Sequence, residues 1–332
     1  MSRSVQRLLP PLAIVAAAAW LGSTPSPGHG QDAADASASP QLALSRTLPR
    51  AIERAAPCVV LIRRAGDSPA ARRSGRSGVL VSKGVVVTSF ANVDVFGLED
   101  LVVEDAGGET HPAKVRGRDL RTQIVALHVP TLSSEPPPLS TGPRLRGTFV
   151  LALGSPLRAG GLPTATFGIL SATGRFQGRA DQLDAALDAS NLGGALVDME
   201  GRLRGVLVHV DARLGDRSGV GFAIPAHHIT PVLDRLLRGD ELEPGYLGLE
   251  IPRAGIGDTG GVEIRTVALQ GPANAAGLRP GDRIVRLGAY PTPDRRAFRA
   301  ASAFLYAGQE IELEILHDGA RRTVKLVVLP RD

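Results

Sequence analysis

Short apolar runs separated by turn-forming residues make up the middle of this 332-residue chain. From residue 45 to about residue 225, the runs either alternate with polar positions or are continuous, which are the patterns of half-buried and fully buried strands. The clearest runs are Val59–Arg64, Gly78–Ser82, Val85–Ser89, Leu101–Glu104, Ile124–Val129, Phe149–Leu153 and Leu203–Val210. So many short strands, in a chain with 39 glycines and 25 prolines, favour a mainly β architecture built as a pair of β-barrels.

The periodicity becomes helical after Pro225. Apolar residues recur at helical spacing at Ile229, Val232, Leu233, Leu236 and Leu237. Gly239 follows them in the position of a C-terminal cap, so a helix is predicted to end there. The polar residues 240–244 predict a hinge, and a second domain is expected to begin near residue 245.

The residues from Asp184 to Val206 carry the most informative motif. Ser190-Asn191-Leu192-Gly193-Gly194-Ala195-Leu196-Val197 follows an aspartate-led strand and precedes a predicted hairpin turn at Asp198-Met199-Glu200-Gly201. This arrangement resembles the nucleophile loop of the HtrA (DegP/DegQ-type) family of trypsin-like serine proteases, which reads Gly-Asn-Ser-Gly-Gly-Pro-Leu-Val. Further stretches resemble other strands of that family in the same order: Pro57–Ile62, Ser77–Ser82, Gly84–Thr88, Leu153–Pro156, Phe167–Ala172 and Gly219–Pro225.

The resemblance implies a chymotrypsin-like double β-barrel followed by a PDZ domain. It covers residues 45–330, with a degenerate protease domain expected over 45–240 and a PDZ domain over 245–330. Each motif alone is weak, but their combination and order are specific.

The same resemblance implies that the catalytic triad is missing. Leu192 stands where the family has its nucleophilic serine. The family's histidine falls at Ala91, or at Asn92 if the loop has gained one residue, and its aspartate falls at Gln123. None of these side chains can attack a carbonyl, shuttle a proton or stabilise an imidazolium. We therefore expect no catalytic residue at the triad-equivalent positions Ala91, Gln123 and Leu192.

The loop around Leu192 departs from the family in other ways. Ser190 replaces a glycine and Ala195 replaces a proline, while Gly193 and Gly194 persist and are interpreted as turn-forming residues. An apolar side chain gains nothing at an exposed loop tip, so Leu192 is predicted to be buried against the former substrate cleft.

From Gly245 the chain resembles the PDZ domain attached to HtrA proteases. The resemblance is carried by Gly245-Tyr246-Leu247-Gly248-Leu249, Gly271-Pro272-Ala273-Asn274-Ala275-Ala276-Gly277-Leu278 and Arg279-Pro280-Gly281-Asp282-Arg283-Ile284-Val285. It implies that an extended peptide adds to a sheet edge while backbone N–H groups hold its terminal carboxylate. A groove helix is expected over Asp294–Tyr306, with Asp294 as N-cap. The expected peptide-binding residues are Tyr246, Leu247, Gly248, Leu249 and Phe298, with Ala301 and Ser302 on the same helix.

The N-terminus has the pattern of a secretory signal over residues 1–30. Arg3 and Arg7 precede an apolar stretch that is too short for a comfortable membrane span. Residues 31–44 are interpreted as a disordered spacer. A periplasmic or secreted protein is expected, with no stable membrane span after signal removal; an uncleaved anchor is the alternative.

Composition argues against a nucleic-acid partner. The formal net charge is +5, but Arg3 and Arg7 belong to the predicted signal, and the other basic residues are scattered apart from a patch at residues 63–76. Cys58 is the only cysteine, so no internal disulfide can form, and it is predicted to be a small core residue.

No metal or other cofactor is expected. The barrel-region histidines His111, His128, His209, His227 and His228 show no metal-ligand spacing and are interpreted as solvent-facing or hydrogen-bonded strand and helix residues. Ser190 could act as a displaced nucleophile only beside a positioned base, and no histidine or lysine occupies a family position next to it.

These features predict a catalytically inactive HtrA-like protein that binds peptide C-termini or misfolded segments, in an envelope quality-control or regulatory role. The alternative is an active serine endopeptidase of the family with misassigned or unconventional catalytic residues; a structural envelope component is a third reading. The expected ligands are peptides or proteins with free apolar C-termini. Residues 31–57 lack the aromatic side chains through which active members commonly trimerise, so a homo- or hetero-oligomer with an active relative stays open.

Overall fold

The structure is a computed structural model that describes residues 40–67, 75–97, 99–156, 160–209, 220–252 and 260–330. The predicted signal over residues 1–30 and most of the predicted spacer lie outside the described residues, as does part of the basic patch. No helix among the residues described is long and apolar enough to cross a membrane.

The described chain begins with a helix, α1, at Pro40–Ala55. Leu48, Ala51, Ile52 and Ala55 share one face of this helix; Ala51 and Ala55 are buried, while Leu48 and Ile52 pack against the barrel core. Residues 40–44, at the end of the predicted spacer, belong to this helix; the rest of the predicted spacer lies outside the described residues.

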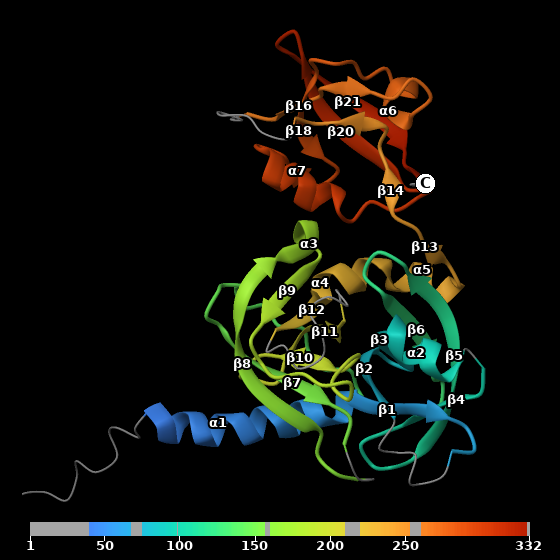
Figure 1. The fold of residues 1–332 in the computed structure, drawn as a ribbon, viewed down its shortest axis with the longest axis vertical. Helices are drawn as coiled ribbons and strands as arrows, with labels where there is room; N and C mark the ends of the chain where they lie inside the picture. Colours follow the sequence, from blue (N-terminus) through green and yellow to red (C-terminus); the bar gives the residue numbers. More distant parts are fainter. Residues whose placement is uncertain are drawn as a thin grey trace, which may run out of the picture. The chain divides into compact units, whose positions relative to one another are not determined.

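The first barrel is formed by β1 to β6, drawn from blue to green-cyan in Figure 1. The strand order is β13-β5-β4-β1-β2-β3-β6, and β5 also pairs with β6, which closes the sheet. A short helix, α2 (Phe90–Phe96), follows β3. The strands are β1 (Val59–Arg64), β2 (Arg76–Ser82), β3 (Val85–Ser89), β4 (Leu101–Glu104), β5 (Thr110–Asp119), β6 (Ile124–His128) and β13 (Glu241–Leu242).

The second barrel is closed in the order β10-β11-β12-β9-β8-β7. Its strands are β7 (Phe149–Gly154), β8 (Thr164–Gly174), β9 (Ala180–Leu183), β10 (Ala195–Val197), β11 (Leu203–Val208) and β12 (Gly221–Pro225), with a short turn of helix, α3 (Arg175–Gly178), between β8 and β9. All seven runs chosen from the sequence are strands, with ends that agree within two residues. The predicted double barrel is confirmed. Cys58 is buried beside β1, as predicted, and burial raises the pKa of its thiol to about 12.

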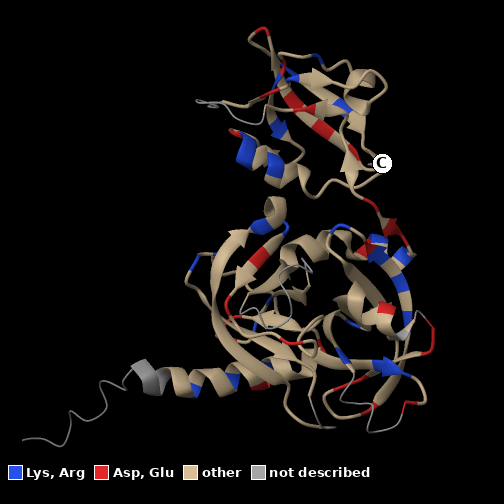
Figure 2. Ribbon diagram, viewed as in Figure 1, with Lys and Arg blue, Asp and Glu red and all other residues tan. Residues whose placement is uncertain are grey.

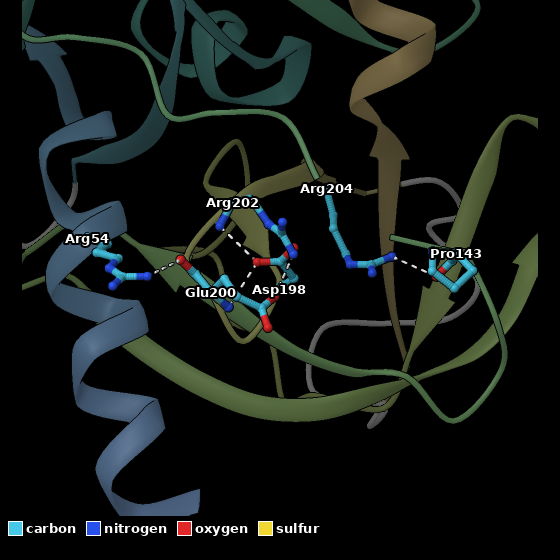
Figure 3. A network of polar contacts seen from close by, with 6 residues as sticks. All are labelled: Arg54, Pro143, Asp198, Glu200, Arg202 and Arg204. Carbon is cyan, nitrogen blue, oxygen red and sulfur yellow. Dashed lines mark hydrogen bonds and ion pairs between the residues drawn. The ribbon is translucent and has the colours of Figure 1, made fainter. Parts of the chain in front are cut away.

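The hairpin turn after β10 is organised by Asp198, as Figure 3 shows. Its carboxylate is only 3% exposed and accepts hydrogen bonds from the N–H groups of Glu200 (3.0 Å) and Arg202 (2.9 Å), and from Arg202 Nε (2.9 Å). Burial alone would raise the pKa of Asp198, but these donors outweigh it and lower the pKa. The carboxylate therefore stays ionised and fixes the turn.

This turn is also where α1 packs on the second barrel. Gly201 has φ +76°, and a Cβ there would lie 2.7 Å from the Ala51 carbonyl oxygen. Arg54 Nη1 donates to the Glu200 carbonyl at 3.4 Å (Figure 3). Only glycine permits both the left-handed backbone and this close approach.

The segment after β12 forms the predicted helix, but in two parts. Helix α4 (Ala226–Ile229) and helix α5 (Leu233–Arg238) are separated by a 3₁₀ turn that contains Pro231. Proline supplies no N–H for a helical hydrogen bond, which accounts for the interruption. Gly239 caps α5 with φ +101°, as predicted.

The predicted hinge at residues 240–244 is instead bound to the first barrel. Within it, β13 pairs in parallel with β5, with Glu241 opposite Arg118, and Leu242 is fully buried. A polar stretch in sequence thus contains one anchoring apolar residue, which the hinge interpretation overlooked.

The last domain is a small β domain with its own core, shown in orange and red in Figure 1. Its helix α7 (Arg295–Ser302) is capped by Asp294, whose side chain accepts from the Ala297 N–H at 2.8 Å, as predicted. The helix is shorter than predicted and ends at Ser302. The other elements are β14 (Gly245–Tyr246), β15 (Leu249–Glu250), β16 (Val262–Glu263), β17 (Thr266–Val267), α6 (Pro272–Ala275), β18 (Arg283–Leu287), β19 (Tyr290–Pro291), β20 (Glu310–His317), β21 (Ala320–Val327) and β22 (Leu329–Pro330).

Candidate functional site

The loop that resembles a nucleophile loop is a tight turn between β9 and β10. Gly193 has φ +78° and a Cβ at this position would collide with Ser77 O, Thr88 Oγ1 and Asn92 Nδ2. Its N–H donates to the Leu207 carbonyl at 2.7 Å. Glycine is required here because the turn is pressed against the first barrel.

Leu192 lies next to this glycine and is half-buried, whereas it was predicted to be buried against the former substrate cleft. Its carbonyl accepts a 2.6 Å hydrogen bond from Asn92 Nδ2. Asn92 is 1% exposed and also donates to Thr88 Oγ1 at 3.0 Å. The Asn92 side chain holds the Leu192 carbonyl. The loop is therefore fixed even though the Leu192 side chain is only half-buried.

The three positions that were predicted to correspond to the triad lie on neighbouring segments. The N–H of Phe90, next to Ala91, donates to the Gln123 carbonyl at 2.7 Å. Asn92, on the other side of Ala91, contacts Leu192. Ala91 itself is exposed, as is Gln123, which has φ +60° and donates through Nε2 to the Leu120 carbonyl at 2.7 Å. Ala91 and Asn92 were the two alternatives for the histidine position. The Asn92 side chain hydrogen-bonds to Thr88 and Leu192 and holds the loop in place.

An acidic side chain folds back onto Ser190 in the loop that resembles a nucleophile loop. Asp188 Oδ1 accepts hydrogen bonds from the Ser190 N–H at 2.7 Å and from Ser190 Oγ at 2.6 Å. The Asn191 N–H donates to the Asp188 carbonyl at 3.1 Å. An oxyanion site needs free N–H donors aimed at the reacting oxygen; here the Ser190 N–H already donates to a carboxylate, and the Ser190 hydroxyl donates to the same carboxylate oxygen and not to a histidine.

Sequence reasoning missed Asp188 as a functional residue. An acid two positions before Ser190 was visible in the motif, but its side chain could have pointed outward. Only the turn geometry shows that it folds back onto the Ser190 N–H.

Three histidines of the described chain have side-chain partners that are not serines. His111 contacts Asp105 and Thr131, His227 contacts Arg144, and His317 contacts Asp282. His227 Nε2 lies 3.0 Å from Arg144 Nη1, and burial followed by the nearby Arg144 charge lowers the pKa of His227. His228 stacks on Phe304 with ring centroids 3.5 Å apart, and burial lowers its pKa to about 3.

One cluster could hold a cation. Carboxylate oxygens of Asp105 and Glu109 and a ring nitrogen of His111 lie within 4.8 Å of one another. However, His111 Nε2 is 3.2 Å from Asp105 Oδ2, and Asp105 Oδ1 accepts the Glu109 N–H at 2.9 Å. These contacts account for the cluster as the closing turn of the β4–β5 hairpin.

The predicted peptide-binding residues occupy different places in the last domain. Gly248 has φ +74°, and a Cβ there would lie 2.9 Å from Gly271 Cα, so this close packing requires glycine. Leu247 and Phe298 are buried in the core of the domain, and Leu249 packs partly exposed against it. Tyr246 lies apart from them: it is 39% exposed and pairs with Leu329 in β14 and β22.

The backbone at Leu249 is arranged to accept another strand. The carbonyls of Gly248 and Glu250 accept hydrogen bonds from Ala268 N (2.8 Å) and Arg265 N (2.8 Å) on the β17 side. Alternate residues of an antiparallel strand bond to opposite edges. The N–H and carbonyl of Leu249 therefore point away from β17.

Two family models match this chain. A trypsin-like peptidase domain matches residues 76–206, and a PDZ domain matches residues 241–328. Of curated relatives, a probable periplasmic serine protease do/HhoA-like of Haemophilus influenzae is 31% identical over 79% of this chain and 59% of its own length. The periplasmic serine endoprotease DegP of Salmonella typhimurium is 31% identical over 75% of this chain and 56% of its own. The chain spans 50–59% of the length of the first curated relatives that it matches.

Solved structures agree with these matches. The serine endoprotease from Yersinia pestis is 29% identical with a TM-score of 0.58, covering 86% of this chain and 98% of that one. The HtrA-type protease AlgW with tripeptide is 29% identical with a TM-score of 0.65, covering 86% and 97%.

The fold and the matches define the class: a chymotrypsin-like double β-barrel followed by a PDZ domain. Within that class, the chain is similar to the HtrA/DegP-type trypsin-like serine proteases with a C-terminal PDZ domain. This is the family that the sequence motifs resembled.

Proposed function

We propose that this chain is a catalytically inactive HtrA-type protein that binds polypeptide C-termini through its PDZ domain. The observation that carries the proposal is the state of the nucleophile loop. Leu192 has no proton to lose, and the Ser190 N–H is engaged by Asp188 at 2.7 Å. Attack on a carbonyl and stabilisation of the resulting oxyanion both lack the groups they need.

The neighbouring positions support the same proposal. Ala91 carries only a methyl group, and Gln123 turns its amide toward the Leu120 carbonyl. A base and a carboxylate that orients it are both needed for a serine to act as nucleophile. Rescue by Ser190 is unsupported, because its hydroxyl donates to Asp188 and no described histidine hydrogen-bonds to it.

The PDZ domain supports a binding function that does not depend on a triad. An incoming strand could pair with the outward-facing backbone of Leu249, while N–H groups near Leu247 and Gly248 receive a carboxylate. Solved HtrA-type relatives are named as holding a tripeptide or a decapeptide. We infer a periplasmic or secreted quality-control or regulatory role from the relatives that are named as periplasmic.

Labelling with a fluorophosphonate probe tests the proposal. The purified protein should show no covalent adduct by intact mass spectrometry and should not degrade unfolded casein, whereas a catalytically active HtrA-type protease treated in parallel should do both. Stoichiometric labelling of any serine would overturn the proposal and favour an endopeptidase with unconventional catalytic residues. Peptide mapping of the adduct would identify the serine.

A further inference from the structure

Two adjoining hollows lie between α7 and the α3 end of the second barrel. The larger has a volume of about 850 Å³ and the smaller about 600 Å³, and Arg144, Gly174 and Arg296 belong to both walls. Together the described walls contain six arginines and no aspartate or glutamate. The six are Arg144, Arg146, Arg175, Arg295, Arg296 and Arg299. In Figure 2, blue segments mark Lys and Arg on α7 and beside α3.

Most of this charge is not neutralised by the protein. Arg144 and Arg295 have partners: Arg144 Nε lies 2.9 Å from Asp181 Oδ2 and its Nη2 pairs with the other carboxylate oxygen, and Arg295 Nη1 donates to the Pro252 carbonyl at 3.4 Å. By contrast, four arginines are exposed and form no ion pair with a described residue; they are Arg146, Arg175, Arg296 and Arg299. Gathering like charges around one concave surface raises the local potential, and a bound anion would relieve the repulsion.

Apolar surface separates the arginines. Tyr290, Ala300 and Phe304 line the larger hollow, and Tyr290 is 62% exposed. Leu145 in the smaller hollow is also 62% exposed. A small inorganic anion would leave these surfaces in water. A chain that alternates carboxylates with apolar groups would use both, because guanidinium groups pair bidentately with carboxylates and also stack on aromatic rings.

The distribution of the arginines favours an extended ligand over a compact one. They are divided between the two hollows: Arg295 and Arg299 line only the larger one, Arg146 and Arg175 line only the smaller one, and Arg144 and Arg296 line both. Neither wall contains the loop at residues 246–249. A ligand here therefore needs no free C-terminus.

We propose that this arginine-lined hollow binds an extended polypeptide segment in which acidic residues alternate with apolar or aromatic ones. The site adds an internal-segment contact to the proposed capture of C-termini. It does not depend on that capture, since the two sites use different residues and different ligand groups.

Fluorescence anisotropy with the whole protein tests the site. The probe is a fluorescein-labelled, C-terminally amidated peptide in which Glu alternates with Leu and Tyr; the matched probe has Gln at every Glu position. The acidic probe should bind at least about tenfold more tightly, which is the effect of losing one strong charge-assisted contact, and its affinity should fall as salt is raised. Equal affinities for the two probes would overturn the proposal.

A matched pair of variants locates the binding. Arg296→Gln/Arg299→Gln should weaken the acidic probe at least about tenfold. Arg238→Gln/Arg321→Gln removes the same charge from side chains that are 65% and 68% exposed and lie outside the hollows, and it should leave the affinity within about twofold. An equal loss of affinity in the two variants would show that binding depends on the net charge of the protein and not on this hollow, and it would overturn the proposed site.

Two further experiments distinguish binding at this site from binding in the PDZ groove, and a polypeptide ligand from a polyphosphate. Leu249→Pro should retain the amidated acidic probe, even if free-acid peptides no longer bind. Loss of the amidated probe in Leu249→Pro would overturn the assignment to the arginine-lined hollow. Tighter binding of inorganic polyphosphate than of the acidic peptide would overturn the assignment to a polypeptide.

Discussion

Tyr306 Oη donates a 2.8 Å hydrogen bond to Asp119 Oδ2, and both residues are 2% exposed. Asp119 also accepts from Thr122 Oγ1 at 2.5 Å and from the Arg121 N–H at 2.9 Å. The turn that leads to Gln123 is therefore hydrogen-bonded to the PDZ domain through a buried phenol.

Removing this phenol should destabilise the protein. Tyr306→Phe leaves the ring in place but deprives the buried Asp119 carboxylate of one donor, which should cost about 1–3 kcal/mol. The unfolding midpoint in urea, followed by circular dichroism, should fall. Tyr246→Phe is the matched control, since Tyr246 is 39% exposed, and its midpoint should not change. Identical midpoints for the two variants would show that the Tyr306–Asp119 bond contributes little.

The Leu192 side chain should contribute modestly to stability. Because it is half-buried, Leu192→Ser should lower the free energy of unfolding by about 1 kcal/mol, less than the roughly 1.5–3 kcal/mol of a fully buried leucine. Leu145→Ser, at a position 62% exposed, should leave the unfolding midpoint in urea unchanged. A raised midpoint in Leu192→Ser would mean that the leucine is strained in this loop.

Rebuilding the triad alone should not rebuild a protease. Ala91→His/Gln123→Asp/Leu192→Ser supplies the missing groups but leaves Asp188 on the Ser190 N–H. Adding Asp188→Ala should release that donor and raise hydrolysis of a fluorogenic peptide by about 10²–10³-fold, the usual value of one oxyanion donor. Asp188→Ala in the natural background should stay inactive. High activity in the triple variant without Asp188→Ala would show that the carboxylate does not block the loop.

Much of the fold could be predicted because local pattern and tertiary structure agree. The strand runs of both barrels, the Gly239 cap and the Asp294 cap each follow from residues adjacent in sequence. Helix α1 was missed because its apolar repeat is sparse and two of its buried positions are alanines, Ala51 and Ala55. Their burial depends on the distant turn at Gly201, which sequence position alone does not reveal.

The site was only partly predictable for a similar reason. The identities at Ala91, Gln123 and Leu192 are readable from the motifs. The roles of Asp188 and Asn92 depend on where short polar side chains turn, and both hydrogen-bond within or across the loop. The hydrogen bond between Asp119 and Tyr306 connects residues 187 positions apart in the chain. No pattern in the neighbouring sequence indicates it.

Acidification should weaken the fold through His228. Burial lowers the pKa of its ring to about 3 in the folded chain, below the roughly 6.5 of an unfolded histidine. The unfolded state therefore binds more protons between these values, and stability falls as the pH drops from about 6.5 toward 3. His228→Phe keeps an aromatic ring against Phe304 and should lose less stability between pH 7 and pH 5 than the natural chain. His128→Phe, at an exposed strand position, should retain the natural pH dependence; if His228→Phe retains it too, His228 is not the titrating group.

Peptide binding by the PDZ domain should depend on a free carboxylate and on the backbone of Leu249. Isothermal titration should be performed on the whole chain, because Tyr306 of the PDZ domain packs in one buried cluster with Val232, Leu236 and Leu242, and an isolated PDZ fragment would expose Tyr306. A peptide with an apolar free C-terminus should bind more tightly than its amidated form, since each charge-assisted hydrogen bond lost costs about 1.5–3 kcal/mol.

The backbone variant completes that test. Leu249→Pro removes the N–H that points away from β17, so it should abolish binding of the free-acid peptide. Leu329→Pro, in a short pairing outside the groove, controls for general damage and should still bind. Equal affinities for the free-acid and amidated peptides would mean that this domain is a docking element and does not receive C-termini.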